Sequence, residues 1–244
     1  MDCEGFREII NLTGATGEPD VQFIKQVEAT GPRLGVFASS FNPVTVAHAE
    51  LMRCAAEQFR LDETLALAGK ANADKSDYEC SLAERLEMLA LAFADDRSVS
   101  VGLSSHAYFV DMVEALERVR PQQNDLHFIV GFDTFERILD REDRYTARYH
   151  RRFANRDEAL AFLLTRSRLI VAGRQGAGQN DIHALIADEP AWMAERILAL
   201  DFPAEFGERS ATEVRERVRA GLPVAGLVPM AVERYIQERG LYRP

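Results

Sequence analysis

Two short segments of the sequence place hydrogen-bond donors at the expected starts of helices. In the first, Thr45 and His48 begin a helix predicted over residues 45–59, directly after a buried strand predicted over residues 34–38. The first turn of a helix presents unpaired backbone N–H groups and the positive end of the helix dipole. A hydroxyl and an imidazole in that turn add donors suited to a bound phosphate. On spacing alone the simpler alternative is favoured, in which Thr45 caps the helix and His48 lies at the surface.

The second segment, residues 207–215, contains Ser210, Thr212 and Arg215 around another predicted helix start. Ser210 and Glu213 form the pattern of a capping box, which is a structural feature. The same arrangement offers two hydroxyls and a guanidinium to a second phosphate. The pattern is common in proteins, so it does not identify a function by itself.

The elements that position these segments alternate along the chain. Apolar runs predict buried strands at residues 34–38, 64–68, 98–102, 126–131, 169–173 and 197–201. Helical patterns occupy residues 45–59, 81–93, 108–118, 156–164, 210–220 and 229–239. This alternation predicts an α/β fold with a doubly wound, Rossmann-like parallel sheet and a helical C-terminal end. Ligands of such sheets bind at the carboxyl ends of the strands near the topological switch point, so the loops after Phe37 and Val130 should meet there with the segment before residue 210.

The chain divides into two parts by its pattern. Residues 1–32 are expected to form an N-terminal helical extension, with a second short helix at residues 21–29 and Gly31-Pro32 at its end. Residues 33–244 are expected to form the main domain. Residues 140–166 are strongly charged, and a solvated helical face is the expected structure there.

Composition excludes several classes of function. The 244 residues include 29 basic and 39 acidic side chains, a net charge of −10, which disfavours nucleic acid or an anionic membrane surface as partner. Cys3, Cys54 and Cys80 form no C-x-x-C pattern, which predicts reduced thiols in a cytoplasm. The acidic start does not resemble a signal peptide, and no apolar run is long enough for a membrane span. A cytoplasmic protein that binds small phosphorylated molecules fits this composition, and the sequence leaves open whether it forms a homo-oligomer.

The first segment resembles the N-terminal signature of the nucleotidylyltransferase superfamily, whose usual form is G-G-x-F-[DN]-P-x-[HT]-x-G-H. The matching residues are Phe41, Asn42, Pro43, Thr45 and His48. Three positions depart from the signature. The two family glycines are Ala38 and Ser39, and the glycine before the last histidine is Ala47. Glycine at these places lets the backbone approach a phosphate closely, so each extra side chain narrows the expected pocket.

The second segment resembles the family's C-terminal motif I-S-S-T-x-x-R, with Arg209 and Ala211 as departures. The residues from Leu227 to Tyr242 then resemble the ending L-V-P-x-x-V-x-x-Y-I-x-x-x-G-L-Y, which is typical of nicotinate and nicotinamide mononucleotide adenylyltransferases. Two motifs in the right order, on either side of an α/β pattern, form a specific signal.

Residues between the two motifs support the resemblance less strongly. Gly131 and Asp133 are similar to the family's G-x-D element, although Asp133 as a helix N-cap is an alternative. Lys70 and Lys75 precede the helix at 81–93 and could reach phosphate, although most loop lysines stay solvated. Arg174 follows a predicted strand and could contact the substrate's phosphate or carboxylate, with a surface arginine as the equal alternative.

Many family members stack the pyridine ring of the substrate on an aromatic side chain, often a tryptophan. The only tryptophan, Trp192, lies too far along the chain to match that position. Tyr108, Phe135 and Tyr145 are the alternatives, and the sequence does not choose among them.

The resemblance implies transfer of AMP from ATP to nicotinate or nicotinamide mononucleotide, with release of pyrophosphate, in NAD biosynthesis. It assigns catalysis to His48, Thr45 and Arg215, with Mg²⁺ bound through the ATP phosphates and no metal held by the protein alone. The implied nucleotide-binding residues are Phe37, Ala38, Ser39, Phe41, Thr45, His48, Gly131, Asp133, Ser210, Thr212 and Arg215. No covalent intermediate is needed, so positioning and charge stabilisation would carry the catalysis.

The sequence is compatible with two alternative functions. A related transferase could use CTP, or ATP with another phosphorylated acceptor; Thr45 fits that alternative, and the C-terminal ending argues against it. A nucleotide-binding relative without catalytic activity would explain the lost loop glycines. The presence together of His48, Thr212 and Arg215 argues against such a relative.

Overall fold

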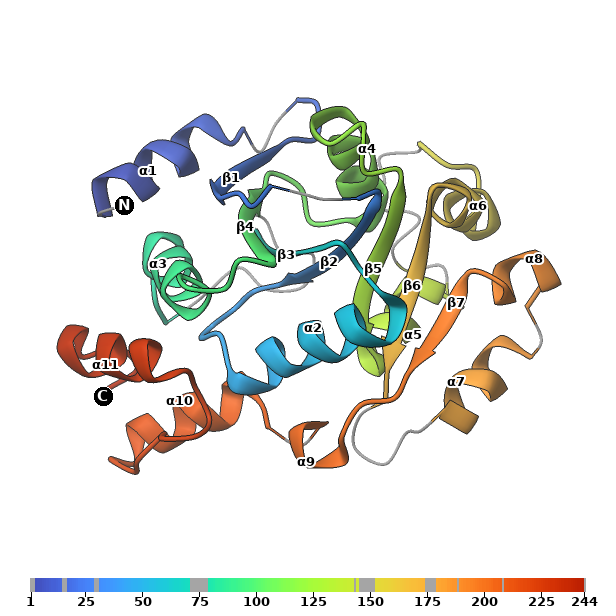
Figure 1. The fold of residues 1–244 in the computed structure, drawn as a ribbon. Coiled ribbons are helices and arrows are strands. Elements are labelled where there is room, and N and C mark those ends of the chain that lie inside the picture. The colour runs from blue at the N-terminus through green and yellow to red at the C-terminus, as the bar shows by residue number, and fades with distance from the viewer. Residues whose placement is uncertain are drawn as a thin grey trace.

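A computed structural model describes residues 3–14, 17–28, 31–70, 79–142, 144, 152–173, 179–187, 189–207 and 209–243. Within these ranges one sheet forms the centre of the molecule, with strands in the order β1-β4-β3-β2-β5-β6-β7 (Figure 1). The strands are β1 (Val21–Lys25), β2 (Arg33–Ser39), β3 (Glu63–Gly69), β4 (Val99–Ser104), β5 (Asp125–Gly131), β6 (Ser167–Ala172) and β7 (Ile197–Leu200). Neighbouring strands from β4 to β7 are parallel, and β1 is antiparallel to β4. The predicted doubly wound parallel sheet is confirmed.

The topological switch point lies between β2 and β5. From β2 the chain adds β3 and β4 on one side and then crosses to add β5, β6 and β7 on the other. Phe37 of β2 pairs in register with Ile129 of β5, so the two strands end at the same edge of the sheet, at Ser39 and Gly131. In doubly wound folds the loops that leave such an edge diverge to opposite faces of the sheet, and ligands bind in the crevice between them.

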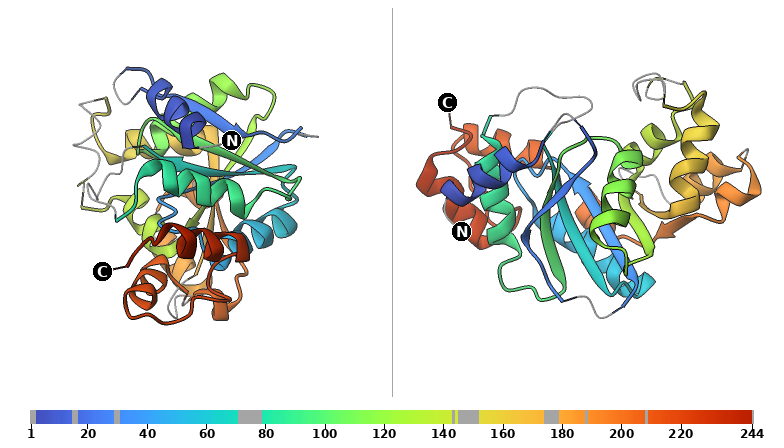
Figure 2. Two further views of the ribbon diagram at one scale, coloured as in Figure 1. Left: turned by 90° about the vertical axis from the view of Figure 1, so that its left-hand side faces the viewer. Right: turned by 90° about the horizontal axis from the view of Figure 1, so that it is seen from above.

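Helices cover both faces of the sheet. They are α1 (Cys3–Leu12), α2 (Val46–Phe59), α3 (Leu82–Ala92), α4 (Phe109–Val119), α5 (Phe132–Leu139), α6 (Arg156–Arg166), α7 (Gln179–Ile186), α8 (Ala191–Ala194), α9 (Ala204–Gly207), α10 (Ala211–Arg219) and α11 (Met230–Arg239). The six helices predicted after residue 33 are present, with ends shifted by at most two residues. Figure 2 shows α11 beside α3, with α1 on the other side of α3.

The core has one apolar layer on each face of the sheet. Along β3 the side chains alternate, with Ala66 and Ala68 packed toward α2 and α3 and Leu65 and Leu67 packed toward α4. Each layer is continuous across the strands, because a parallel sheet covered on both faces buries every position of its central strands. The apolar run that predicted β3 reflects this burial.

One N-terminal prediction is wrong. Residues 21–29 were expected to form a helix, and Val21–Lys25 instead forms the edge strand β1, with Val21 opposite Ser104 of β4. The β-branched and aromatic residues of this stretch suit a strand, and β4 offers an unpaired edge for it. The division of the chain into residues 1–32 and residues 33–244 stays a prediction.

No helix of the described residues is long and apolar enough to cross a membrane. Cys54 and Cys80, the cysteines whose side chains are described, are free thiols.

Candidate active site

The loop between β2 and α2 ends in a reciprocal cap made by Thr45 and His48. The Thr45 hydroxyl accepts a hydrogen bond from the His48 backbone N–H at 3.3 Å, and His48 Nδ1 accepts one from the Thr45 N–H at 3.1 Å. An imidazole therefore takes the place that a glutamate or glutamine side chain usually has in a capping box. Thr45 does cap the helix, and His48 is half-buried rather than a plain surface residue.

This cap fixes the His48 ring in orientation and tautomer. Because Nδ1 accepts a hydrogen bond, the neutral ring carries its proton on Nε2, which makes that nitrogen a donor. The ring also packs against Phe37, with centroids 5.5 Å apart, and against Phe41 at 5.4 Å in a nearly perpendicular arrangement. The backbone of Phe41 is left-handed, with φ 45°, which directs its ring against the histidine. An imidazole N–H is thus held in a set orientation at the N-terminus of α2.

The C-terminal motif lies against the same loop. Arg215 Nη1 donates to the carbonyl oxygen of Asn42 at 2.7 Å, and Nη2 donates to the Thr212 hydroxyl at 3.1 Å. Ser210 is the N-cap of α10 and accepts from the Glu213 N–H at 3.1 Å, which is one half of the predicted capping box. The two predicted phosphate-binding segments therefore meet, although they are far apart in the sequence.

The carboxyl end of β5 adds a third helix start. Gly131 ends β5 and is the N-cap of α5, and a Cβ atom placed on it would meet no heavy atom within 4 Å. Asp133 lies in the first turn of α5 with an exposed side chain, so the alternative that it caps this helix is wrong. The predicted residues Ala38 and Ser39, at the end of neighbouring β2, are half-buried at the same edge.

The structure decides several of the remaining predictions. Phe135 has an exposed fraction of 0% in the core beneath α5, so it cannot stack on a ligand. Tyr108 is half-buried at the start of α4, just after β4, on the carboxyl side of the sheet.

The Lys70 ammonium donates to the carbonyl oxygens of Ile10 at 2.6 Å and Thr13 at 2.5 Å, which stabilises the end of α1. Lys75, Arg174 and Tyr145 lie outside the described residues.

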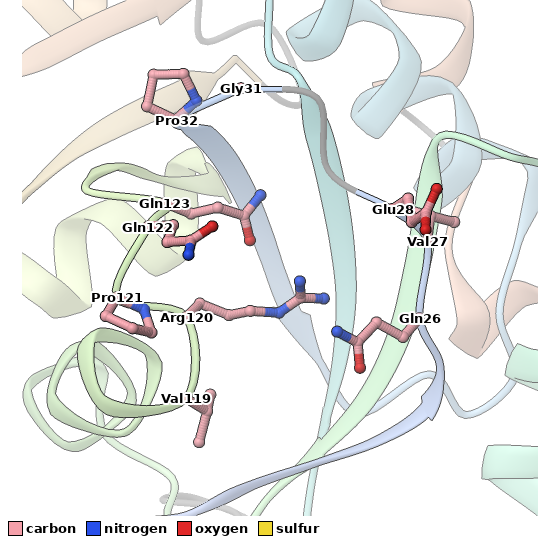
Figure 3. Close-up of a pocket in the computed structure, with 10 residues that line it drawn as sticks. All are labelled: Gln26, Val27, Glu28, Gly31, Pro32, Val119, Arg120, Pro121, Gln122 and Gln123. Atoms are coloured by element: carbon pink, nitrogen blue, oxygen red, sulfur yellow. The ribbon is translucent and has the colours of Figure 1, made fainter.

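A cavity of about 830 Å³ lies at the opposite end of the sheet (Figure 3). It is lined by segments that come before the parallel strands β2 and β5, including Pro32 and Gln123. Arg120 and Gln123 from its wall bind the buried Glu63 carboxylate at 3.1 and 2.9 Å. The cavity faces the amino ends of the strands, away from Thr45 and His48. Two of its polar lining residues, Arg120 and Gln123, already bind Glu63.

Arg85 contacts the loop before α2, and it was not predicted from the sequence. Arg85, buried in α3, donates through Nη1 to the carbonyl oxygen of Ser40 at 2.8 Å. The sequence did contain a signal for it, because Arg85 stands beside Leu86 and Leu89 on the buried face of its helix. A charged residue on an apolar helix face needs a buried partner, and here the partner is the loop before His48.

Comparison with known proteins agrees with this geometry. The cytidylyltransferase-like family model matches residues 36–217. A probable nicotinate-nucleotide adenylyltransferase of Gemmatimonas aurantiaca is 31% identical over 219 residues, which is 86% of this chain and 92% of the relative. One of Moorella thermoacetica is 30% identical over 218 residues, 87% of this chain and 92% of the relative.

Solved structures share the fold at lower identity. The nicotinic acid mononucleotide adenylyltransferase of Plasmodium falciparum, solved with NaAD, has a TM-score of 0.59 and 15% identity. The match covers 86% of this chain and 96% of that chain. At this identity the likeness supports the arrangement of strands and helices alone.

Proposed function

The chain belongs to the cytidylyltransferase-like family of nucleotidyltransferases, and from that premise we propose that it transfers AMP from ATP to nicotinate mononucleotide with release of pyrophosphate. Relatives at 30% identity or more, over most of their length, carry the name nicotinate-nucleotide adenylyltransferase. The observation that carries the proposal is the hydrogen bond from Arg215 to Asn42. It brings two separate donor groups together at the carboxyl end of β2, where they would form one phosphate-binding site.

The reaction needs a site that holds charge rather than a protein nucleophile. A phosphate oxygen of the mononucleotide attacks the α-phosphorus of ATP in line, a P–O bond forms, and the bond to pyrophosphate breaks. ATP would lie across the ends of β2 and β5, with its triphosphate between the starts of α2 and α10. Both reactants are anionic, so positive groups that bring them together lower the barrier.

Each donor has a role in this arrangement. His48, held by Thr45, donates from Nε2 to the phosphates and stabilises charge that develops on the departing oxygens. Arg215, with Thr212 and Ser210, holds the β and γ phosphates and then pyrophosphate. One such donor contributes on the order of 3 kcal/mol to lowering the barrier.

Magnesium would enter with ATP. Among the described residues, no three His, Cys, Asp or Glu side chains gather closely enough to hold a metal ion. The donors of the site are an imidazole, hydroxyls and a guanidinium, which suit phosphate oxygens rather than Mg²⁺. We therefore propose Mg–ATP as the substrate, with the ion bound through phosphate oxygens.

The acceptor would lie toward β4. Of the aromatic candidates that the structure describes, Tyr108 is half-buried and Phe135 is fully buried, and we propose that Tyr108 contacts the pyridine ring. Lys75 and Arg174 stay predicted contacts for the acceptor's phosphate or carboxylate.

A pyrophosphate-release assay tests the proposal. The purified chain is given Mg–ATP with nicotinate mononucleotide or with nicotinamide mononucleotide, and we expect turnover with a higher kcat/KM for the nicotinate form. Mg–CTP in place of Mg–ATP is the control for the nucleotide. Turnover with CTP alone would favour the related-transferase alternative. ATP binding in a thermal-shift assay without turnover would favour a binding protein.

A further inference from the structure

The side chain of Asn42 is the centre of a buried hydrogen-bonded group. Its Oδ1 atom accepts from the Tyr242 hydroxyl at 2.8 Å and from the Cys80 thiol at 3.0 Å. The Cys80 sulfur and the Tyr242 oxygen are themselves 3.1 Å apart. All three residues are buried, with exposed fractions of 7% for Asn42, 6% for Cys80 and 4% for Tyr242. We call these three residues the Asn42 junction.

The junction connects three distant parts of the chain. Asn42 belongs to the loop before α2, Cys80 comes just before α3, and Tyr242 follows α11. Tyr242 adopts a left-handed backbone conformation with φ 61°, which a tyrosine rarely does. Such backbone conformations persist where surrounding contacts fix them, and they gather at functional sites. In this conformation the Tyr242 hydroxyl contacts both other members of the junction.

The backbone of Asn42 faces the catalytic side. Its carbonyl oxygen accepts from Arg215 Nη1 at 2.7 Å, and its side chain is held by the junction. Fixing the side-chain oxygen restricts rotation of the whole residue, and with it the direction of the carbonyl group. That carbonyl in turn sets the plane of the Arg215 guanidinium, whose other terminal nitrogen donates to Thr212.

We propose that Tyr242 and Cys80 are positioning residues, which hold Asn42 so that its carbonyl group orients Arg215 toward the phosphates of ATP. The inference rests on the proposed function, because it assigns Arg215 to those phosphates. Neither residue touches the reactants. Their effect passes through Asn42 and would appear in nucleotide binding and turnover rather than in stability alone.

Both donors keep their protons at neutral pH. Burial raises the pKa of the Cys80 thiol and the pKa of the Tyr242 phenol. A thiol and a phenol that stay protonated can each donate a hydrogen bond. The junction is therefore a neutral group whose geometry depends on hydrogen bonds rather than on ion pairs.

The chain offers a matched control for Tyr242. Tyr235, on α11, is also buried, and its hydroxyl donates to Glu87 on α3 at 2.8 Å. Tyr235→Phe removes the phenol hydrogen bond from α11 to Glu87 of α3. Tyr242→Phe removes the phenol hydrogen bond to Asn42 at the junction. Tyr235 makes no hydrogen bond to the loop before α2 among those described, so the two variants separate loss of stability from loss of positioning.

The experiment compares Tyr242→Phe and Tyr235→Phe for melting temperature, ATP dissociation constant by calorimetry, kcat, and KM for each substrate. We expect both variants to lower the melting temperature. We expect Tyr242→Phe alone to weaken ATP binding and lower kcat/KM for ATP about tenfold, with KM for the mononucleotide changed less. Equal kinetics in the two variants, or wild-type kinetics in Tyr242→Phe, would overturn the proposal.

A second pair of variants keeps the test valid if Tyr242→Phe does not fold. Cys80→Ala removes a donor, and Cys80→Ser restores one of similar kind. We expect Cys80→Ala to weaken ATP binding and Cys80→Ser to recover part of that loss, whereas equal ATP affinity in both would contradict a role for the thiol.

The ATP dissociation constant also distinguishes failure of this proposal from failure of the proposed function. If the wild type binds ATP but does not turn over, the proposed function fails, and the junction is still judged by the dissociation constants.

Discussion

Arg215 and Arg219 lie one helical turn apart on α10 and bind the same carboxylate, that of Glu79. Arg215 Nε is 3.4 Å from Glu79 Oε1 and its Nη1 donates to the Asn42 carbonyl, whereas Arg219 reaches Glu79 from a more exposed position. Both arginines are therefore positively charged, lie on α10 and bind Glu79. They differ because Arg215 also donates a hydrogen bond to the loop before α2.

Arg215→Ala is expected to raise KM for ATP and lower kcat/KM by roughly 10- to 100-fold, because a charge-assisted hydrogen bond contributes about 1.5–3 kcal/mol. Arg219→Ala is the matched control and is expected to stay within about threefold of wild type, since its ion pair is exposed. Steady-state kinetics with varied ATP measure both. Similar losses in the two variants would mean that overall charge, and not the position of Arg215, matters.

His48→Ala is expected to lower kcat by about 10²–10³-fold, as removal of an oriented donor to developing charge does in other enzymes. Its effect on the fold should be small, because Thr45 still caps α2 through its own hydroxyl. The control is His183→Ala, a histidine exposed on α7. Full turnover by the folded His48 variant would remove this residue from the mechanism.

Ser210→Ala is expected to cost about 1 kcal/mol of unfolding free energy through loss of the α10 N-cap, and also to raise KM for ATP. Asn155→Ala removes a comparable cap, since Asn155 Oδ1 accepts from the Glu158 N–H at 2.9 Å at the start of α6. Urea unfolding and ATP kinetics are measured on both variants. An unchanged KM in Ser210→Ala would leave Ser210 with a structural role alone.

His127 makes stability depend on pH. Its burial in β5 lowers the pKa of the imidazole below the ordinary value of 6.5, although Asp125 opposes part of this effect. As the pH falls through about 6.5, the imidazole of His127 gains a proton in the unfolded chain but stays neutral in the folded chain. The free energy of unfolding therefore decreases as pH falls below about 6.5, until the pH reaches the lower folded pKa.

The measurement is the urea midpoint at pH 7.5 and pH 5.5 for wild type and His127→Gln. Wild type is expected to lose more stability than the variant across that interval. His183→Gln, at an exposed position, serves as the control and should behave as wild type does. An equal decrease in wild type and His127→Gln would show that other groups cause the pH dependence.

The sheet was predictable because its strands are buried on both faces. A stretch such as Leu65–Ala68 is apolar at every position, which a half-buried strand would not be. β1 was not predictable in this way, because Val21 is its only fully buried residue and its partner β4 lies about 80 positions further along the chain. Short edge strands are determined by a tertiary partner more than by their own sequence.

Candidate site residues at the start of a helix were predictable from the local sequence pattern. Features that depend on other parts of the chain were less predictable. The positions of Thr45, His48 and Ser210 follow from strand–loop–helix patterns. The use of a histidine in the capping box was not foreseen, because glutamate and glutamine are the usual residues there. The burial of Phe135 depends on the position of α5, a helix that the sequence indicated only through the alternative of Asp133 as an N-cap.

The hydrogen bond between Asn42 and Tyr242 spans 200 positions of the chain, and this separation has a consequence for biosynthesis. A ribosome synthesises the chain from its amino end, so the sheet around β2 can begin to form long before residue 242 leaves the exit tunnel. The loop before α2 acquires its last hydrogen bonds only when that residue has been added. A nascent or prematurely terminated chain would therefore possess His48 and the central strands, yet lack the hydrogen bond from Tyr242 that we propose to position Asn42 and Arg215.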